Sequence, residues 1–183
     1  YFYNHSISKI FKNWILKLNN KMYKIFIYYT DNKFDHITNL IKEHADNFFY
    51  HTNIDQLINQ ISKDSLDALI YLDIGSSPKM QILGSLRLAP LQCLAMGHPV
   101  TSGFKNIDYF LSSELMEIQS SQNHYSERLI KLPNTGQCLE KLSLKNVKSK
   151  KISTKLNKIF FLNLQSLFKL LPQDDHVYLD IIK

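Results

Sequence analysis

The chain has 183 residues, of which 44% are hydrophobic and 21% charged. This balance suffices for a buried core and argues against a disordered chain, and no apolar run reaches the about 20 residues that a membrane-spanning helix needs. The net charge of +6 rests on 22 lysines and arginines, of which only Arg87 and Arg128 are arginines. Because nucleic-acid readers rely on the planar fork of arginine, we expect solvated lysine faces and no nucleic-acid partner.

Cysteine usage and the start of the chain indicate a cytoplasmic location. Cys93 and Cys138 lie far apart and lack CxxC spacing, so neither a disulfide scaffold nor a zinc site is indicated. The first residues, YFYNH, show neither the basic nor the apolar region of a signal peptide. We therefore expect a reducing, cytoplasmic environment.

Predicted strands and helices alternate along most of the chain. Apolar residues at helical spacing predict helices over residues 6–18, 34–45, 54–61 (with Asn53 as N-cap), 80–86 and 177–183. Dense apolar runs give strand candidates at residues 23–29, 47–50, 66–73, 91–96, 107–111 and 128–132. About five or six β–α steps before Pro133 predict an α/β fold, a Rossmann-like parallel sheet with crossover helices.

The composition changes near residue 141, which suggests a domain boundary. Residues 141–158 are rich in Lys, Ser and Asn without an apolar period, as in a linker or exposed loop. A new apolar run begins at residue 159, and the chain stops in what looks like mid-helix. We therefore expect residues 1–140 to form a first domain, incomplete at its start, and residues 159–183 to begin a second, truncated one.

Four ordered blocks occupy the middle of the chain. They are RLAPLQ at 87–92, MGHPVTSG at 96–103, Asp108-Tyr109, and YSERL at 125–129 followed by Leu132-Pro133. In this order and spacing they resemble the family of O-linked N-acetylglucosamine transferases and SPINDLY-like proteins. His98 and the YLDIG turn at 71–75 resemble its bacterial branch, which includes the cytoplasmic N-glucosyltransferases that modify adhesins.

Two weaker similarities extend the resemblance over nearly the whole chain. Asn4-His5-Ser6 looks like the family's histidine motif, which opens a helix beside acceptor and sugar. SLFKL at residues 166–170 resembles a block whose lysine meets the nucleotide diphosphate. The resemblance implies a GT-B glycosyltransferase with two Rossmann-like domains, of which this chain would hold most of the first and the start of the second.

The activity implied by the resemblance is transfer of a hexose or N-acetylhexosamine from a UDP-sugar to Asn or Ser/Thr of a protein. Such a transfer needs an aligned acceptor, help with its proton and stabilisation of the leaving diphosphate. We assign catalytic roles to His5, which can accept a proton or hydrogen bond, and to Lys169, which can stabilise the diphosphate charge. No DxD motif is present and Asp174-Asp175 lies in a polar turn, so we expect no metal and no other cofactor.

The predicted substrate-binding residues are Met96, Gly97, Pro99 and Ser166. Gly97 permits close approach of the backbone to a ligand, and Pro99 fixes the turn. Arg87 stands out in a lysine-rich chain, and we favour a structural role in which its guanidinium binds a carboxylate of the fold. We expect Asp108 to be structural as well.

Alternative functions stay open on these residues. Ile7 and Lys9 stand where animal relatives carry Thr and His, and Ser166 stands where they carry a glutamine, which leaves donor and competence undecided. One alternative is an inactive remnant or protein-binding module without the donor-binding half. Another is a lysine-rich nucleic-acid binder, which would need a clustered basic face, whereas these lysines are dispersed.

Overall fold

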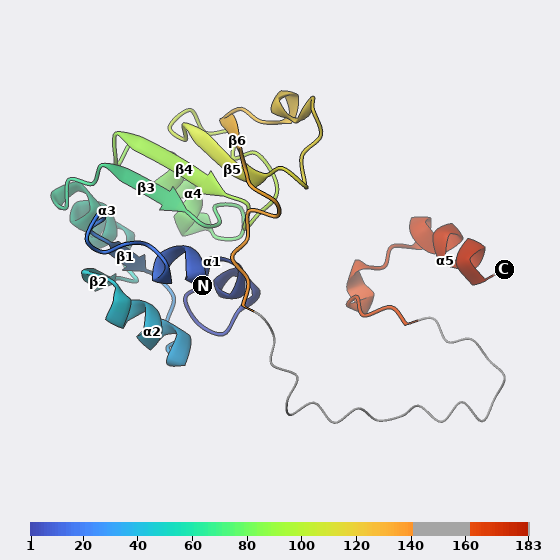
Figure 1. The fold of residues 1–183 in the computed structure, drawn as a ribbon, viewed down its shortest axis with the longest axis horizontal. Helices are drawn as coiled ribbons and strands as arrows, with labels where there is room; N and C mark the ends of the chain where they lie inside the picture. The colour runs from blue at the N-terminus through green and yellow to red at the C-terminus, as the bar shows by residue number, and fades with distance from the viewer. Residues whose placement is uncertain (141–161, 183) are drawn as a thin grey trace. The chain divides into compact units, whose positions relative to one another are not determined.

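The computed structural model describes residues 1–140 and 162–182, which belong to two units, Tyr1–Leu142 and Ser143–Lys183 (Figure 1). The linker predicted at residues 141–158 lies outside the described residues. The first unit contains, in chain order, α1 (Ser6–Leu16), β1 (Phe26–Tyr29), α2 (His36–His44), β2 (Asn47–Tyr50), α3 (Ile54–Lys63), β3 (Ala68–Tyr71), α4 (Pro78–Gly84), β4 (Leu91–Ala95), β5 (Tyr109–Ser113), the 3-10 turn η1 (Ser121–His124) and β6 (Arg128–Leu132). The predicted α/β fold is confirmed.

Local capping explains where the helices of the first unit begin. Asp35 caps α2, because its carboxylate accepts hydrogen bonds from the backbone N–H groups of Ile37 at 2.9 Å and Thr38 at 3.3 Å. Asn53 caps α3 as predicted, and its side-chain oxygen accepts from the N–H of Gln56 at 3.0 Å. Such bonds satisfy donors that have no partner inside the helix.

Within residues 1–140 every strand pair is parallel. β1 pairs with β2, and the other strands form a four-stranded sheet in the order β3-β4-β5-β6. The expected count of about five or six β–α steps before Pro133 is too high, because helices follow only β1, β2 and β3: residues 96–108 contain no helix, and residues 114–127 contain only η1. The physical reason is local, since the stretch GHPVTSG carries two glycines and a proline and has no apolar period.

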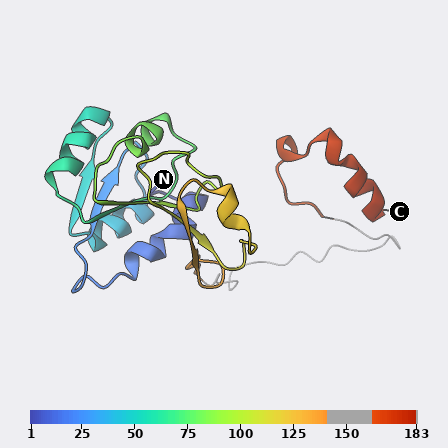
Figure 2. The ribbon, with the colours of Figure 1, turned by 90° about the horizontal axis from the view of Figure 1, so that it is seen from above.

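Helices cover the two faces of the four-stranded sheet unequally. α3 and α4 lie on one face and α1 on the other (Figure 2). Beside α1 runs the segment that follows β6, held by hydrogen bonds from Trp14 Nε1 to the Gly136 carbonyl at 3.0 Å and from Asn13 Nδ2 to the Cys138 carbonyl at 2.7 Å. The larger hydrophobic core cluster contains side chains from helices and from strands. Phe11 of α1, Leu57 of α3, Leu94 of β4 and Phe110 of β5 are among its most buried members.

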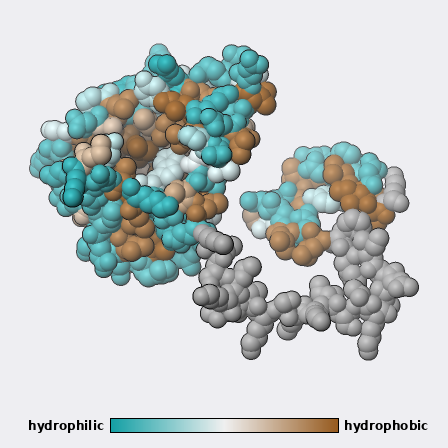
Figure 3. All heavy atoms as spheres, in the orientation of Figure 1, coloured by the Kyte–Doolittle hydropathy of each residue, from teal (hydrophilic) through white to brown (hydrophobic). Residues whose placement is uncertain are grey.

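Part of the sheet face on which α1 lies is exposed to solvent. Ile70 on β3 is 49% exposed, Leu91 on β4 37% and Ile130 on β6 36%. Apolar side chains gather around a hollow over β3 and β4 in Figure 3. A parallel sheet is ordinarily covered on both faces, whereas these three apolar side chains are partly exposed on the face that carries α1.

The second unit is described from residue 162 to 182. It contains two 3-10 turns, η2 (Leu167–Lys169) and η3 (Pro172–Asp174), and the helix α5 (Asp175–Ile182), which starts two residues before the predicted helix. None of its described side chains is buried. Across the described parts of the chain, no helix is long and apolar enough to cross a membrane.

Candidate functional site at the carboxyl edge of the sheets

The segment that precedes α1 connects the ends of two strands. The backbone N–H of Asn4 donates to Asp35, after β1, at 2.6 Å. The Tyr1 hydroxyl lies 2.9 Å from Ser76 Oγ, which donates to Asp73, after β3, at 2.6 Å. The N-terminal residues thus cross the carboxyl ends of β1 and β3, the edge at which ligands bind in parallel α/β sheets.

His5 is the N-cap of α1. Its Nδ1 accepts a hydrogen bond from the backbone N–H of Ile7 at 3.2 Å, and its own N–H donates to Ser8 Oγ at 3.3 Å. The ring stacks on Tyr1, with centroids 4.5 Å apart and planes 15° from parallel. A neutral imidazole that accepts through Nδ1 carries its proton on Nε2. Its other nitrogen, which has no hydrogen-bond partner among the described residues, is therefore a donor in this arrangement.

Gly97 brings the ends of β3 and β4 into close contact. Its N–H donates to the Leu72 carbonyl at 3.1 Å, and a Cβ on Gly97 would lie 2.1 Å from that carbonyl oxygen. Met96 is 6% exposed, and its methyl group lies near Gly136, so its side chain belongs to the core. Pro99 is exposed. Gly97 thus holds the strand ends together, with Met96 beneath them and Pro99 in solvent.

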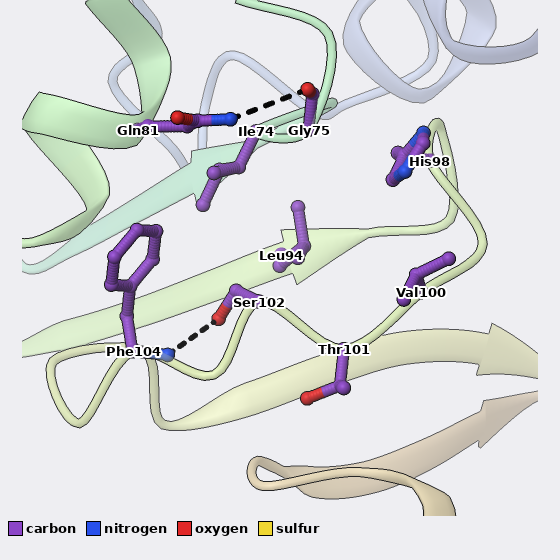
Figure 4. Close-up of a pocket in the computed structure, with 9 residues that line it drawn as sticks. All are labelled: Ile74, Gly75, Gln81, Leu94, His98, Val100, Thr101, Ser102 and Phe104. Carbon is purple, nitrogen blue, oxygen red and sulfur yellow. Dashed lines mark hydrogen bonds between the residues drawn. The ribbon is translucent and has the colours of Figure 1, made fainter. Parts of the chain in front are cut away.

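A pocket of about 370 Å³ opens beside this turn (Figure 4). Its floor is apolar and its rim is polar, with side chains from α4 and from the connection after β4. The lining residues are Ile74, Gly75, Gln81, Leu94, His98, Val100, Thr101, Ser102 and Phe104. An apolar cavity with a few converging polar groups is the usual form of a small-ligand site.

The His98 ring forms one wall of the pocket and depends on a glycine. A Cβ on Gly75 would lie 2.3 Å from His98 Cδ2, so any larger residue at position 75 would displace the ring. Opposite, Gln81 Nε2 donates to the Gly75 carbonyl at 3.4 Å. His98 therefore offers ring nitrogens at the rim, and the family-type block GHPVT contributes to the pocket through His98, Val100 and Thr101.

Arg87 and Asp108 form a brace at the opposite end of the sheet. The guanidinium makes two parallel bonds to the carboxylate, Nη1 to Oδ2 at 2.6 Å and Nη2 to Oδ1 at 3.0 Å. Asp108 Oδ2 also accepts from the N–H of Gln92, at the start of β4, at 2.7 Å. Because this cluster lies at the amino ends of β4 and β5, away from the pocket, the structural role expected for Arg87 and Asp108 is confirmed.

Lys169 and Ser166 belong to the second unit. Both are exposed in or beside η2, and Lys169 Nζ lies 6.0 Å from the centre of the Phe168 ring. Ser166 is the N-cap of η2 but its side chain makes no capping bond. Their assignment to a diphosphate site stays a prediction, as do the substrate contacts of Met96, Gly97 and Pro99.

Sequence reasoning missed most of the pocket wall. It used Gly75, His98 and Ser102 only as parts of family-like segments, without a role for their side chains. It did not single out Gln81 or Phe104, which carry no local signal. Glu127 entered only as part of the family block at residues 125–129 and was given no role, yet it is 2% exposed and binds the loop that lines the pocket. Within the described residues no group of three or more His, Cys, Asp or Glu side chains could hold a metal ion.

Most of the chain is similar to known proteins. The profile of glycosyl transferase family 41 matches residues 1–174. The chain belongs to this family. It is 25% identical over 143 residues to a probable UDP-N-acetylglucosamine–peptide N-acetylglucosaminyltransferase SPINDLY of Petunia hybrida, and 22% identical to the protein of the same description from Solanum lycopersicum. Each alignment covers 75% of this chain but only 15% of the relative.

A solved structure shows the same fold. The O-GlcNAc transferase of Thermobaculum terrenum, solved as its K341M mutant, matches with a TM-score of 0.69 at 20% identity. The match covers 74% of this chain and 26% of that one. The family expected from the sequence blocks is therefore confirmed, with a fold shared with an O-GlcNAc transferase, whereas membership of a bacterial branch stays a prediction.

Proposed function

We propose that this chain is part of a glycosyltransferase that moves a sugar from a UDP-sugar to a protein side chain. The observation that carries the proposal is the pocket at the carboxyl edge, because the family-type block GHPVT and the turn after β3 together form its wall. The SPINDLY relatives are described as probable UDP-N-acetylglucosamine–peptide N-acetylglucosaminyltransferases, which supports the donor and acceptor classes. The sugar would be a hexose or N-acetylhexosamine, and the acceptor Asn or Ser/Thr.

The proposed reaction is a direct displacement at the anomeric carbon. The acceptor atom forms a bond to C1 of the sugar, the bond from C1 to the diphosphate oxygen breaks, and its electron pair leaves with UDP. The acceptor's proton must leave at the same time. Lys169 would offset charge on the departing diphosphate, and Ser166 would contact the nucleotide. This scheme uses no metal ion.

We assign His5 the part of a hydrogen-bond donor in this reaction. Its Nδ1 is occupied by the Ile7 N–H, which leaves the Nε2 hydrogen for the substrate. To act as the base, the ring would have to give up the cap of α1 and move its proton. The acceptor's proton would then pass to an oxygen of the leaving diphosphate, which is charged and lies next to the reacting carbon.

The test is transfer of radiolabelled sugar from UDP-glucose and UDP-N-acetylglucosamine to protein acceptors, paired with calorimetric titration of UDP. We expect label in protein from one of the two donors, unchanged by a chelator. UDP binding without transfer, or neither, would favour the alternative of a protein-binding module. A loss of transfer on chelation would contradict the metal-free scheme.

A further inference from the structure

Glu127 is a buried carboxylate beneath the pocket. It precedes β6 and is 2% exposed. Its Oε2 accepts from Thr101 Oγ1 at 2.7 Å, and its Oε1 accepts from the backbone N–H of Ser102 at 2.8 Å and from the Ser102 hydroxyl. One side chain therefore holds two consecutive residues of the pocket wall, which lie 26 and 25 positions earlier in the sequence.

These bonds keep the carboxylate charged without a cation. No ion pair to Glu127 is present among the described residues. Burial by itself raises the pKa of Glu127, but the hydrogen bonds from Ser102 and Thr101 outweigh it and bring the pKa below its ordinary value. An ionised carboxylate only accepts hydrogen bonds, so the hydrogens of both hydroxyls point toward Glu127.

The direction of these hydrogens decides what the pocket rim offers to a ligand. Thr101 Oγ1 also accepts from the N–H of Ser126 at 3.1 Å and lies 2.8 Å from Ser126 Oγ. Ser102 Oγ accepts from the N–H of Phe104 at 3.2 Å (Figure 4), which leaves it one free lone pair. This part of the rim can therefore accept a hydrogen bond but not donate one, and the charge of Glu127 lies directly behind it.

We propose that Glu127 is a positioning residue that holds Thr101 and Ser102 in the pocket wall and makes the pocket select a neutral, hydroxyl-bearing group over a phosphate. A sugar hydroxyl can donate to Ser102 Oγ, whereas a phosphate oxygen would meet a lone pair and a buried negative charge. The inference rests on the proposed function, and within it the pocket receives the pyranose of the donor while the diphosphate lies elsewhere.

Glu117 provides a matched control. It lies in the same connection between β5 and β6, and its Oε1 accepts from Ser112 Oγ at 2.6 Å and from the Tyr125 hydroxyl at 2.7 Å. Burial raises its pKa too, and the bonds from Ser112 and Tyr125 help to bring the pKa below the ordinary value. Neither Ser112 nor Tyr125 lines the pocket. Glu117→Gln therefore changes a bonded carboxylate of the same kind without touching Thr101 or Ser102.

The first measurement is amide hydrogen exchange, which needs no activity. Replacing the carboxylate by an amide of equal size in Glu127→Gln removes charge-assisted bonds to residues 101 and 102. We expect exchange of the Ser102 amide to rise about tenfold or more in Glu127→Gln and to stay within about twofold in Glu117→Gln, as one lost bond to a charged group predicts. Equal exchange in Glu127→Gln and the unsubstituted chain would overturn the holding role.

The second measurement compares UDP-sugar with UDP on the same variants, in the active protein. We expect Glu127→Gln to raise KM for the UDP-sugar about tenfold, with kcat within about threefold and the Kd of UDP unchanged. A rise in the Kd of UDP of the same size would overturn the assignment of the pocket to the sugar. If the unsubstituted protein binds UDP-sugar and Glu127→Gln binds it equally well, Glu127 has no positioning role. If the unsubstituted protein binds no UDP-sugar, the proposed function itself fails together with the ligand assignment, and the exchange result still decides whether Glu127 holds the loop.

Discussion

His5 combines two roles that are usually found in different residues. An N-cap needs a side-chain acceptor close to the first turn, and Nδ1 of an imidazole can supply it only while that nitrogen carries no proton. The bond from Ile7 therefore selects the tautomer of His5 as well as starting α1. Stacking on Tyr1 orients the ring, so the Nε2–H direction is determined by the same local contacts.

Replacement of His5 by asparagine and by alanine separates these roles. Asn is a strong N-cap, so His5→Asn should keep the free energy of unfolding within a few tenths of a kcal/mol, whereas His5→Ala should lose about 1 kcal/mol. Both can be measured by urea denaturation. In the transfer assay His5→Ala should fall about tenfold or more, and His5→Asn should retain part of the rate because its amide N–H can still donate. Equal inactivity of the two variants would instead favour His5 as the base.

For Arg87, the composition of the chain predicted how the side chain is used but not where it lies. Its rarity in a lysine-rich chain predicted use of its fork geometry, and the two bonds to Asp108 confirm that prediction. Its place at the amino end of the strands could not be predicted without the fold. Gln92, which is fully buried and bonds Leu88, Leu86 and Asn106 through its side-chain amide, belongs to the same cluster.

The pairing of β3 with β4 depends on close approach at their carboxyl ends. Gly97 lies where the turn after β4 meets the Leu72 carbonyl, and there is no room for a side chain. Gly103, later in the same connection, has φ +70° and open space around it. Gly97 is thus required by the close approach of the Leu72 carbonyl, and Gly103 by its positive φ.

Alanine at these two positions should have unequal effects. Gly97→Ala forces backbone atoms apart, and we expect a loss of about 3 kcal/mol in unfolding free energy, as for overpacked sites. Gly103→Ala places a Cβ at positive φ, and we expect about 1 kcal/mol. Thermal and urea unfolding measure both. A loss at Gly97 no greater than that at Gly103 would contradict the close approach of the strand ends.

Across the whole first unit, several carboxylates are held by hydrogen bonds or an ion pair. The guanidinium of Arg87 lowers the pKa of Asp108, and the bonds from Ser102 and Thr101 lower that of Glu127 against the effect of burial. A group whose pKa is lower in the folded state stabilises the protein fully above its unfolded pKa. That contribution is lost as the pH falls through the folded pKa.

Acid should therefore destabilise the first unit in a defined window. The ordinary pKa values are 3.8 for Asp108 and 4.5 for Glu127. We expect the contribution of these groups to the free energy of unfolding to be constant at pH values well above 4.5 and to fall below that value. Urea titrations at several pH values measure the slope. Glu127→Gln should show a shallower fall than the unsubstituted protein, and an equal slope in both would mean that Glu127 is not held as an anion.

The helices, the six strands of the first unit and the family could be predicted because each depends on residues that are close together in the sequence. Asn53 caps α3 by bonding a residue only three positions away. The apolar periodicity of a helix is visible over one turn, and that of a strand over a few residues. The ordered blocks at residues 87–133 identified the family for the same reason. The count of five or six β–α steps was too high because it extended the α/β rule over a segment whose own glycines and proline oppose a helix.

Tertiary structure alone decided which residues of that segment form the site. Met96 and His98 are two positions apart, yet one side chain enters the core and the other lines the pocket, because the chain leaves the regular alternation of β4 between them. Glu127, just before β6, bonds Thr101 and Ser102 in the connection after β4. The two segments come together because β4, β5 and β6 are neighbours in the sheet. Contacts of this kind depend on the direction of side chains after a strand has ended and on the order of strands in the sheet, which no local pattern encodes.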